Sequence, residues 1–144
     1  MLTAPLPSGV ECEMDTKSAI RVLLVDDHAV FRQTMRSELA SYPDLEVIGE
    51  ASNGAEAFEL VARLSPTVVL MDIHLGRITD GLGATRVLTS QYPRMAVLGL
   101  SCDTREYVAA AMYQAGALEV LAKDESTHNV YRAILRAVAS MSDE

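Results

Sequence analysis

The chain has 144 residues, of which 49% are hydrophobic and 22% charged, and its formal net charge is −8. This composition is typical of a soluble globular protein, and the acidic balance argues against direct nucleic-acid binding by the chain itself. No apolar stretch is long enough for a membrane span, and the N-terminus lacks the pattern of a signal peptide. Cys12 and Cys102 are too few for a disulfide framework and lack metal-site spacing, so we expect a reducing cytoplasm.

The chain divides into a short leading segment and one domain. Residues 1–19 mix proline, glycine and charge without periodicity, which predicts a flexible N-terminal tail. Apolar runs and helical patterns alternate over residues 20–141, a length that suits a single domain. Residues 142–144 are expected to be a C-terminal tail or the start of a linker.

Five strand–helix units are predicted in chain order. Strands are expected at 22–25, 46–51, 67–71, 97–100 and 118–122. Helices are expected at about 30–39, from the Asn53-Gly54 turn to residue 64, at 82–90 and at 104–115, with a last one around 130–138. Gly116 is expected as a left-handed stop of the fourth helix. This alternation predicts an α/β fold, a flavodoxin-like (βα)5 doubly wound parallel sheet with strand order 2-1-3-4-5.

Four of the five apolar strands end on a chemically capable residue. Asp26 and Asp27 follow the first strand, Asp72 the third, Ser101 the fourth and Lys123 the fifth. Because the carboxyl ends of parallel strands meet at one edge of the sheet, these side chains are expected to form one site.

The chemistry of this set points to phosphoryl transfer. Three carboxylates at one edge repel each other unless a cation neutralises them or one stays protonated, and their oxygens suit Mg²⁺. The Lys123 ammonium and the Ser101 hydroxyl suit phosphate oxygens. Asp72 is flanked by the other groups and is the natural acceptor of a phosphoryl group as an acyl phosphate.

The order and spacing of these motifs resemble the receiver domain of two-component response regulators over residues 21–141. Asp72 precedes Ser101 by 29 residues, and Ser101 precedes Lys123 by 22. The Asp-Asp-His-x-x-x-Arg run that begins at Asp26, together with Lys-Asp in place of Lys-Pro, is similar to the NarL/FixJ-like branch. The four matching runs are Leu24–His28, Met71–Ile73, Leu100–Ser101 and Ala122–Asp124.

The resemblance implies a role for each of these residues. Asp72 would accept a phosphoryl group from a histidine kinase or a phosphotransfer protein, and Ser101 and Lys123 would contact its oxygens and relay its presence to the surface. The chain would be no enzyme in its own right, but a phosphoacceptor that assists its own phosphorylation and dephosphorylation. The implied Mg²⁺ ligands are Asp26 (largely through water), Asp27, Asp72 and the backbone carbonyl of His74.

The chain departs from the family pattern in two places. Gly76 stands where a proline is usual, four residues after the acceptor, and the glycine expected eight residues after it is Gly81, at nine. Val120 replaces the usual aromatic residue three before the lysine, and Glu119 replaces a common glycine. These differences concern the output step more than the phosphorylation site.

Other interpretations remain open at this point. The aspartates could cap the helices that follow them, and His28 is expected at a helix start without direct chemistry. His74 and Asp103 could tune phosphate lifetime or be ordinary loop residues, and Cys102 is expected to be a small residue that allows access.

Three other functions compete with the phosphorylation switch: a phosphorylation-independent pseudo-receiver scaffold, a single-domain regulator that acts by protein binding, and a hydrolase with Asp72 as nucleophile. The last lacks the second aspartate that such hydrolases typically have, since His74 stands there. A homodimer is left open, no membrane partner is expected, and DNA would be reached only through a downstream helix-turn-helix domain.

Overall fold

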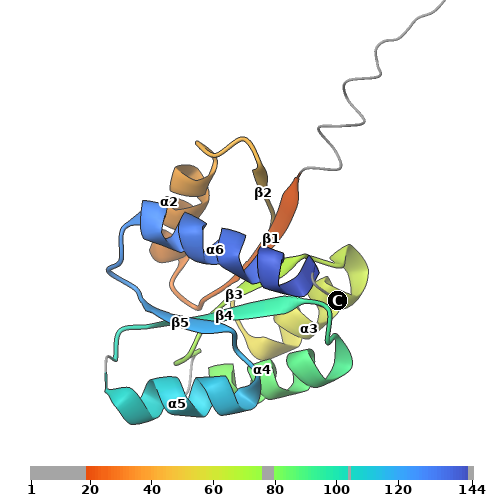
Figure 1. Ribbon diagram of the computed structural model, residues 1–144, viewed down its shortest axis with the longest axis vertical. Coiled ribbons are helices and arrows are strands. Elements are labelled where there is room, and N and C mark those ends of the chain that lie inside the picture. The colour runs from red at the N-terminus through yellow and green to blue at the C-terminus, as the bar shows by residue number, and fades with distance from the viewer. Residues whose placement is uncertain (1–18, 76–79, 104, 143–144) are drawn as a thin grey trace, which may run out of the picture.

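The computed structural model describes residues 19–75, 80–103 and 105–142, and in these ranges strands and helices alternate (Figure 1). The strands are β1 (Ile20–Val25), β2 (Leu45–Ala51), β3 (Val68–Asp72), β4 (Ala96–Ser101) and β5 (Glu119–Ala122). The helices are α2 (Ala29–Leu39), α3 (Gly54–Leu64), α4 (Asp80–Gln91), α5 (Glu106–Ala115) and α6 (Thr127–Ser142). All ten predicted elements are present, with ends shifted by a few residues. The predicted tails, apart from residues 19 and 142, lie outside the described residues.

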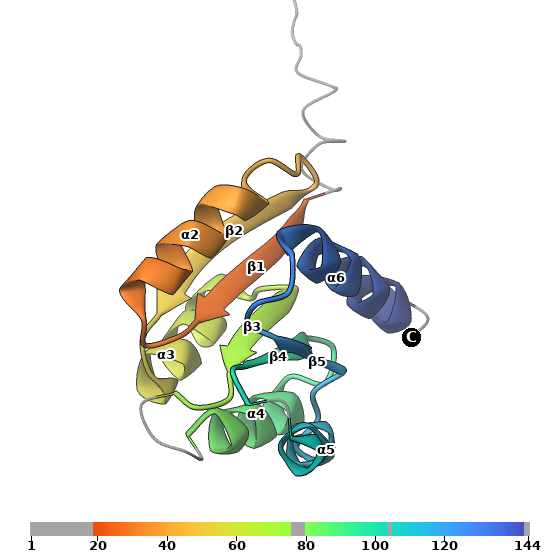
Figure 2. The same cartoon turned by 90° about the vertical axis from the view of Figure 1, so that its left-hand side faces the viewer.

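The strands form one parallel sheet in the order β2-β1-β3-β4-β5, which confirms the predicted flavodoxin-like topology. Helices α2 and α6 cover one face of the sheet, and α3, α4 and α5 cover the other (Figures 1 and 2). Successive side chains of a strand point to opposite faces, so Val22 and Leu24 of β1 join the core under α2 and α6 while Leu23 and Val25 join the other. Strands β1, β3 and β4 carry apolar runs at 22–25, 68–71 and 96–100, because both of their faces are buried.

Local sequence explains where several helices begin and end. The Asn53 side chain caps α3 by accepting from the backbone N–H of Glu56 at 2.9 Å, and the Glu56 carboxylate accepts from the N–H of Ser52, one residue before the cap, at 2.8 Å. The start of α3 at Gly54 agrees with the predicted turn into this helix at Asn53-Gly54. Gly116 ends α5 with φ +114°, which confirms the predicted left-handed stop.

Glycine at position 81 lets α4 approach the end of β3. Its N–H donates to the carbonyl of Ile73 at 3.2 Å, and a Cβ there would lie 2.1 Å from the carbonyl oxygen of Asp72. Only glycine permits this approach, which sets the first turn of α4 directly against the predicted acceptor.

None of the described helices combines the length and the apolar composition that a membrane span would need.

Candidate functional site

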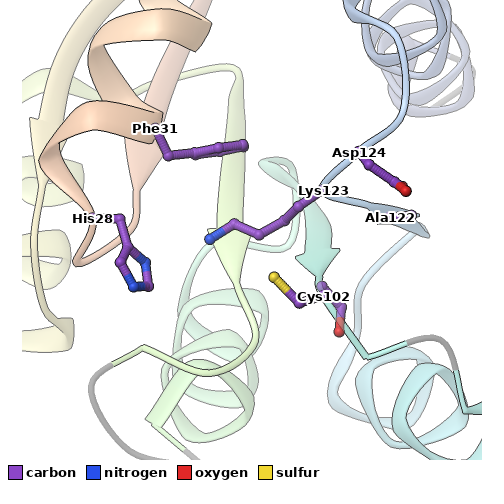
Figure 3. Close-up of a pocket in the computed structure, with 7 residues that line it drawn as sticks. His28, Phe31, Cys102, Ala122, Lys123 and Asp124 are labelled. Atoms are coloured by element: carbon purple, nitrogen blue, oxygen red, sulfur yellow. The ribbon is translucent and has the colours of Figure 1, made fainter.

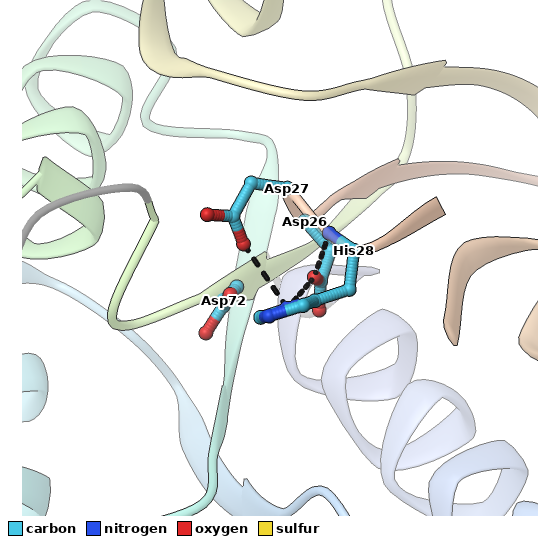
Figure 4. Close-up of side chains that lie close together, drawn as sticks. All are labelled: Asp26, Asp27, His28 and Asp72. Carbon is cyan, nitrogen blue, oxygen red and sulfur yellow. Dashed lines mark hydrogen bonds and ion pairs between the residues drawn. The ribbon is translucent and has the colours of Figure 1, made fainter. Parts of the chain in front are cut away.

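Acidic side chains gather where β1 and β3 end, as the topology predicts. Carboxylate oxygens of Asp26, Asp27 and Asp72 and a ring nitrogen of His28 all lie within 4.8 Å of one another (Figure 4). Asp26 and Asp72 are buried, at 2% and 3% exposure, whereas the Asp27 side chain is about a third exposed, at 32%. The pairing of β1 with β3 creates this cluster from residues 45 positions apart.

Lys123 joins the cluster from the end of β5. Its Nζ lies 2.5 Å from Oδ2 of Asp26 and 3.5 Å from Oδ2 of Asp72, and 4.5 Å from the centre of the Phe31 ring. Burial alone would lower the pKa of Lys123, but the hydrogen bond to Asp26 and the charges of Asp72 and Asp26 outweigh it and raise the pKa. Lys123 is therefore a firmly charged ammonium inside the site.

The two oxygens of Asp72 differ in their hydrogen bonding. Its Oδ1 accepts from the backbone N–H of His74 at 3.1 Å, whereas Oδ2 has no hydrogen-bond partner among the described residues. Burial, followed by the charge of Asp26, raises the pKa of Asp72, against the opposing effect of Lys123. Asp72 therefore combines an available oxygen with an environment in which a further cation would be favourable.

The site is short of positive charge. Three ionised carboxylates contribute −3 and the Lys123 ammonium +1, which leaves a formal charge of −2. A divalent cation offsets this deficit, and the carboxylate donors are the hard oxygen ligands that Mg²⁺ prefers. The donor set, the charge and Oδ2 of Asp72, which accepts no hydrogen bond from the described residues, all fit such an ion.

Ser101 ends β4 and is buried at 2% exposure. Its hydroxyl donates to the carbonyl of Asp103 at 2.9 Å and accepts from the N–H of the same residue at 2.8 Å. Ser101 and Lys123 line one pocket of about 460 Å³, across which the lysine side chain extends between Phe31 and Cys102 (Figure 3). The hydroxyl is near the site, but it is engaged with the main chain of its own loop.

His28 contacts the acidic cluster, which the sequence interpretation missed. It stands at the N-cap of α2, so its predicted place at a helix start is confirmed. Its backbone N–H donates to Oδ1 of Asp26 at 2.8 Å, and its Nδ1 lies 3.1 Å from Oδ1 of both Asp26 and Asp27 (Figure 4). The signal in the sequence was its place two residues after an aspartate, where an Asx turn brings the chain back onto the carboxylate.

The alternative in which Asp26 or Asp27 caps α2 is wrong, because the N-cap residue is His28, and its side chain makes no capping hydrogen bond. The carboxylate of Asp103 is held by Arg105, whose hydrogen bonds lower the pKa of Asp103 to about 2. Asp103 is thus committed to a local ion pair.

Of the residues that depart from the family pattern, the structure describes Val120 and Glu119 but not Gly76, which lies outside the described residues. Val120 packs half-buried against the core on the α5 side and lines a small pocket of about 180 Å³ together with Ser101. Its backbone N–H donates to the Tyr113 hydroxyl at 3.3 Å, while the neighbouring Glu119 carboxylate accepts two hydrogen bonds from Arg136, at 2.7 and 2.8 Å.

Comparison with known proteins now identifies the family. Residues 22–135 match the response regulator receiver domain. The chain belongs to this family. The receiver domain of NarL from Mycobacterium tuberculosis superposes with a TM-score of 0.79 at 29% identity, covering 85% of this chain and 98% of that one.

The relatives of this chain include transcriptional regulatory proteins and methylesterases. The chain is 33% identical over 122 residues to the transcriptional regulatory protein DegU of Brevibacillus brevis. The aligned part is 85% of this chain and 51% of DegU. The chain is also 39% identical over 116 residues to protein-glutamate methylesterase/protein-glutamine glutaminase 1 of Methanosarcina acetivorans. The aligned part is 79% of this chain and 33% of that protein. The chain thus spans a third to a half of these relatives and matches their receiver part. The receiver domain is a phosphoacceptor of two-component signalling, and the acidic cluster is typical of its Mg²⁺ site.

Proposed function

We propose that this chain is a phosphorylation-dependent switch of a two-component phosphorelay, with Asp72 as the acceptor, Mg²⁺ as cofactor and a histidine kinase or phosphotransfer protein as donor. The observation that carries the proposal is the position of buried Asp72, whose Oδ2 accepts no hydrogen bond from the described residues and lies 3.5 Å from Nζ of Lys123, beside Asp26. Residues 20–141 are the proposed receiver domain, and the cytoplasm is its proposed location.

Asp72 acts as the nucleophile in this proposal. A carboxylate oxygen of Asp72 forms a bond to the donor's phosphorus while the phosphorus–nitrogen bond of the donor's phosphohistidine breaks, and the leaving imidazole takes up a proton from solvent. The product is an acyl phosphate on Asp72. Burial raises the pKa of this carboxyl, and the charge of Lys123 opposes that shift and favours the ionised, nucleophilic form.

The surrounding residues hold and neutralise the transferred group. Asp27 and Asp72, the carbonyl of His74 and, largely through water, Asp26 would hold Mg²⁺, which supplies positive charge against the phosphoryl oxygens when bound. Lys123 already lies 3.5 Å from Asp72 and offers its ammonium to one phosphoryl oxygen. Ser101 can donate to another once its hydroxyl rotates away from the carbonyl of Asp103, which now accepts it.

We further propose that the chain is the receiver part of a NarL/FixJ-like transcriptional regulator. The run from Asp26 to Arg32 supports this branch: the Arg32 guanidinium donates to the carbonyl of Asp26 at 2.5 Å and to Glu50 at 2.9 Å, and DegU is among the relatives. Methylesterase relatives have a similar sequence identity to this chain. The downstream reading frame therefore tests the proposal: a helix-turn-helix segment there would support it, and a methylesterase segment would overturn it.

The phosphorylation proposal is tested by intact-mass analysis after incubation with Mg²⁺ and a small phosphodonor. We expect the mass of one added phosphoryl group in the wild type and in Asp124→Asn, an exposed acid beside the same pocket, and none in Asp72→Asn. An unmodified wild type would instead favour the pseudo-receiver scaffold, which Val120 in place of the usual aromatic residue also favours.

A further inference from the structure

We propose that Arg105 is a positioning residue that restrains phosphoryl transfer: through Asp103 it keeps the Ser101 hydroxyl engaged with its own loop. The inference rests on the proposed phosphorylation of Asp72 and adds a regulation of that site. The Ser101 hydroxyl donates to the backbone carbonyl of Asp103 at 2.9 Å and accepts from the backbone N–H of the same residue at 2.8 Å. A hydroxyl has one proton, so in this arrangement none is available for a phosphoryl oxygen.

The side chain of Asp103 fixes the backbone that engages Ser101. Its Oδ1 accepts from the backbone N–H of Arg105 at 3.0 Å and from Nε of the same residue at 2.9 Å. Nε also donates to Oδ2 at 3.1 Å, and Nη2 pairs with that oxygen. A forked contact between guanidinium and carboxylate is directional as well as charged. We call this set of contacts between Ser101, Asp103 and Arg105 the latch.

The latch continues to an exposed aromatic ring. Cζ of Arg105 lies 4.8 Å from the centre of the Tyr107 ring, within the range of a cation–π contact. Arg105 is the N-cap residue of α5, and Tyr107, in the first turn of this helix, is 63% exposed. Because one guanidinium contacts both the Asp103 carboxylate and this ring, opening of the latch changes the surroundings of a side chain that a partner can reach.

The loop has space in which to rearrange. A small pocket of about 180 Å³ lies beside it, and its lining includes Ser101, Asp103, Arg105 and Val120. Valine leaves more of this space open than an aromatic side chain at the same position would. Rotation of the Ser101 hydroxyl toward the acceptor releases both backbone groups of Asp103, and the pocket gives the loop room to repack. The signal then reaches Tyr107 without an aromatic residue at position 120.

The latch opposes the reaction that it regulates. In the proposed function, Ser101 donates to a phosphoryl oxygen only after its hydroxyl has turned away from Asp103. That rotation leaves the N–H and the carbonyl of Asp103 without their partner, which is costly unless both groups can turn toward water. The contacts with Arg105 restrain the backbone against such a turn. Breaking them should therefore make phosphorylation faster.

The test measures the rate constant for phosphorylation of Asp72 by acetyl phosphate and Mg²⁺, with acetate as the leaving group, by intact mass over time. Arg136→Gln is the matched control, because Arg136 is a comparably exposed arginine that donates two hydrogen bonds to one carboxylate, that of Glu119, at 2.7 and 2.8 Å. We expect Arg105→Gln to raise the rate constant roughly threefold to tenfold, as for residues coupled in one network, and the control to leave it unchanged. In a Ser101→Ala background Arg105→Gln should have no effect, because no hydroxyl remains to be released.

A second measurement needs no phosphodonor. Hydrogen exchange of the Asp103 backbone N–H requires this group to leave Ser101, so it should be faster in Arg105→Gln than in the wild type and in Arg136→Gln. An unchanged or lower rate constant in Arg105→Gln, an equal increase in the Ser101→Ala background, or unchanged exchange at Asp103 would overturn the inference. A wild type that acetyl phosphate does not modify would refute the proposed function, and the exchange measurement would still decide whether the latch exists.

Discussion

Replacing Lys123 by methionine should destabilise the metal-free protein, because it leaves the carboxylates without their internal cation. At an effective dielectric constant of about 20, the separations of 2.5 Å from Asp26 and 3.5 Å from Asp72 correspond to gross attractions of about 7 and about 5 kcal/mol. Desolvation offsets most of this, and removal of one partner from a buried ion pair costs about 3–5 kcal/mol net. Methionine keeps much of the stem, so the loss reports mainly on charge.

The measurement is urea unfolding followed by circular dichroism at pH 7.5, with and without Mg²⁺. We expect a loss of about 3–5 kcal/mol in the free energy of unfolding without metal, and a larger gain from Mg²⁺ in the variant than in the wild type, since the cation replaces the lost charge. Arg63→Met is the matched control, because Arg63 forms an exposed pair with Glu59 at 3.5 Å and should change stability by less than about 1 kcal/mol. A Lys123→Met variant as stable as that control would refute the charge-deficit account of the site.

Two further predictions concern Asp72 and the helix beside it. Because burial raises the pKa of Asp72, the protonated carboxyl favours the folded state below the ordinary pKa of about 4, and this contribution is lost as pH rises through the raised value. Asp72→Asn should therefore be more stable than the metal-free wild type at neutral pH, by on the order of 1 kcal/mol, and this gain should vanish in acid. Urea unfolding of both proteins from pH 3 to 8 measures the difference. A gain in stability that grows in acid would contradict the prediction. Gly81→Ala should lower stability by about 1–3 kcal/mol because its Cβ would lie 2.1 Å from the carbonyl oxygen of Asp72. Gly83→Ala, which meets nothing within 4 Å in the same helix, should raise stability by up to about 1 kcal/mol; thermal unfolding compares the two, and equal effects would show that the close approach at Gly81 is not real.

The fold was predictable because its signals are long and redundant. Unbroken apolar runs such as 68–71 and 97–100 belong to strands with two buried faces, and their alternation with helices leaves few topologies. The meeting of Asp26, Asp27 and Asp72 follows from that topology alone, since β1 and β3 are neighbours.

The remainder of the site depends on loop geometry, which apolar periodicity does not encode. The contact of His28 with two carboxylates follows from a turn closed by a single backbone hydrogen bond to Asp26. The engagement of the Ser101 hydroxyl by Asp103 is likewise a local turn. Such short-range contacts are decided by backbone angles in a few residues, so the sequence identified the participants without their orientation.

Val120 concerns the output step of the domain rather than the phosphorylation site. The residue is half-buried, and the Tyr113 hydroxyl contacts its backbone N–H at 3.3 Å at the edge of the sheet. The contacts described above for Asp72, its carboxylate neighbours and Lys123 do not involve Val120, so a different output mechanism is compatible with the proposed phosphorylation site.

The central claim is that Asp72 carries the phosphoryl group, and site mapping after transfer from a phosphorylated histidine kinase tests it most directly. Borohydride reduces an acyl phosphate on aspartate to homoserine, which peptide mass spectrometry locates in the sequence. We predict homoserine at position 72, dependent on both Mg²⁺ and the kinase. Homoserine at Asp26, Asp27 or Asp103 instead, or none at all under conditions in which the kinase phosphorylates another receiver, would contradict the account.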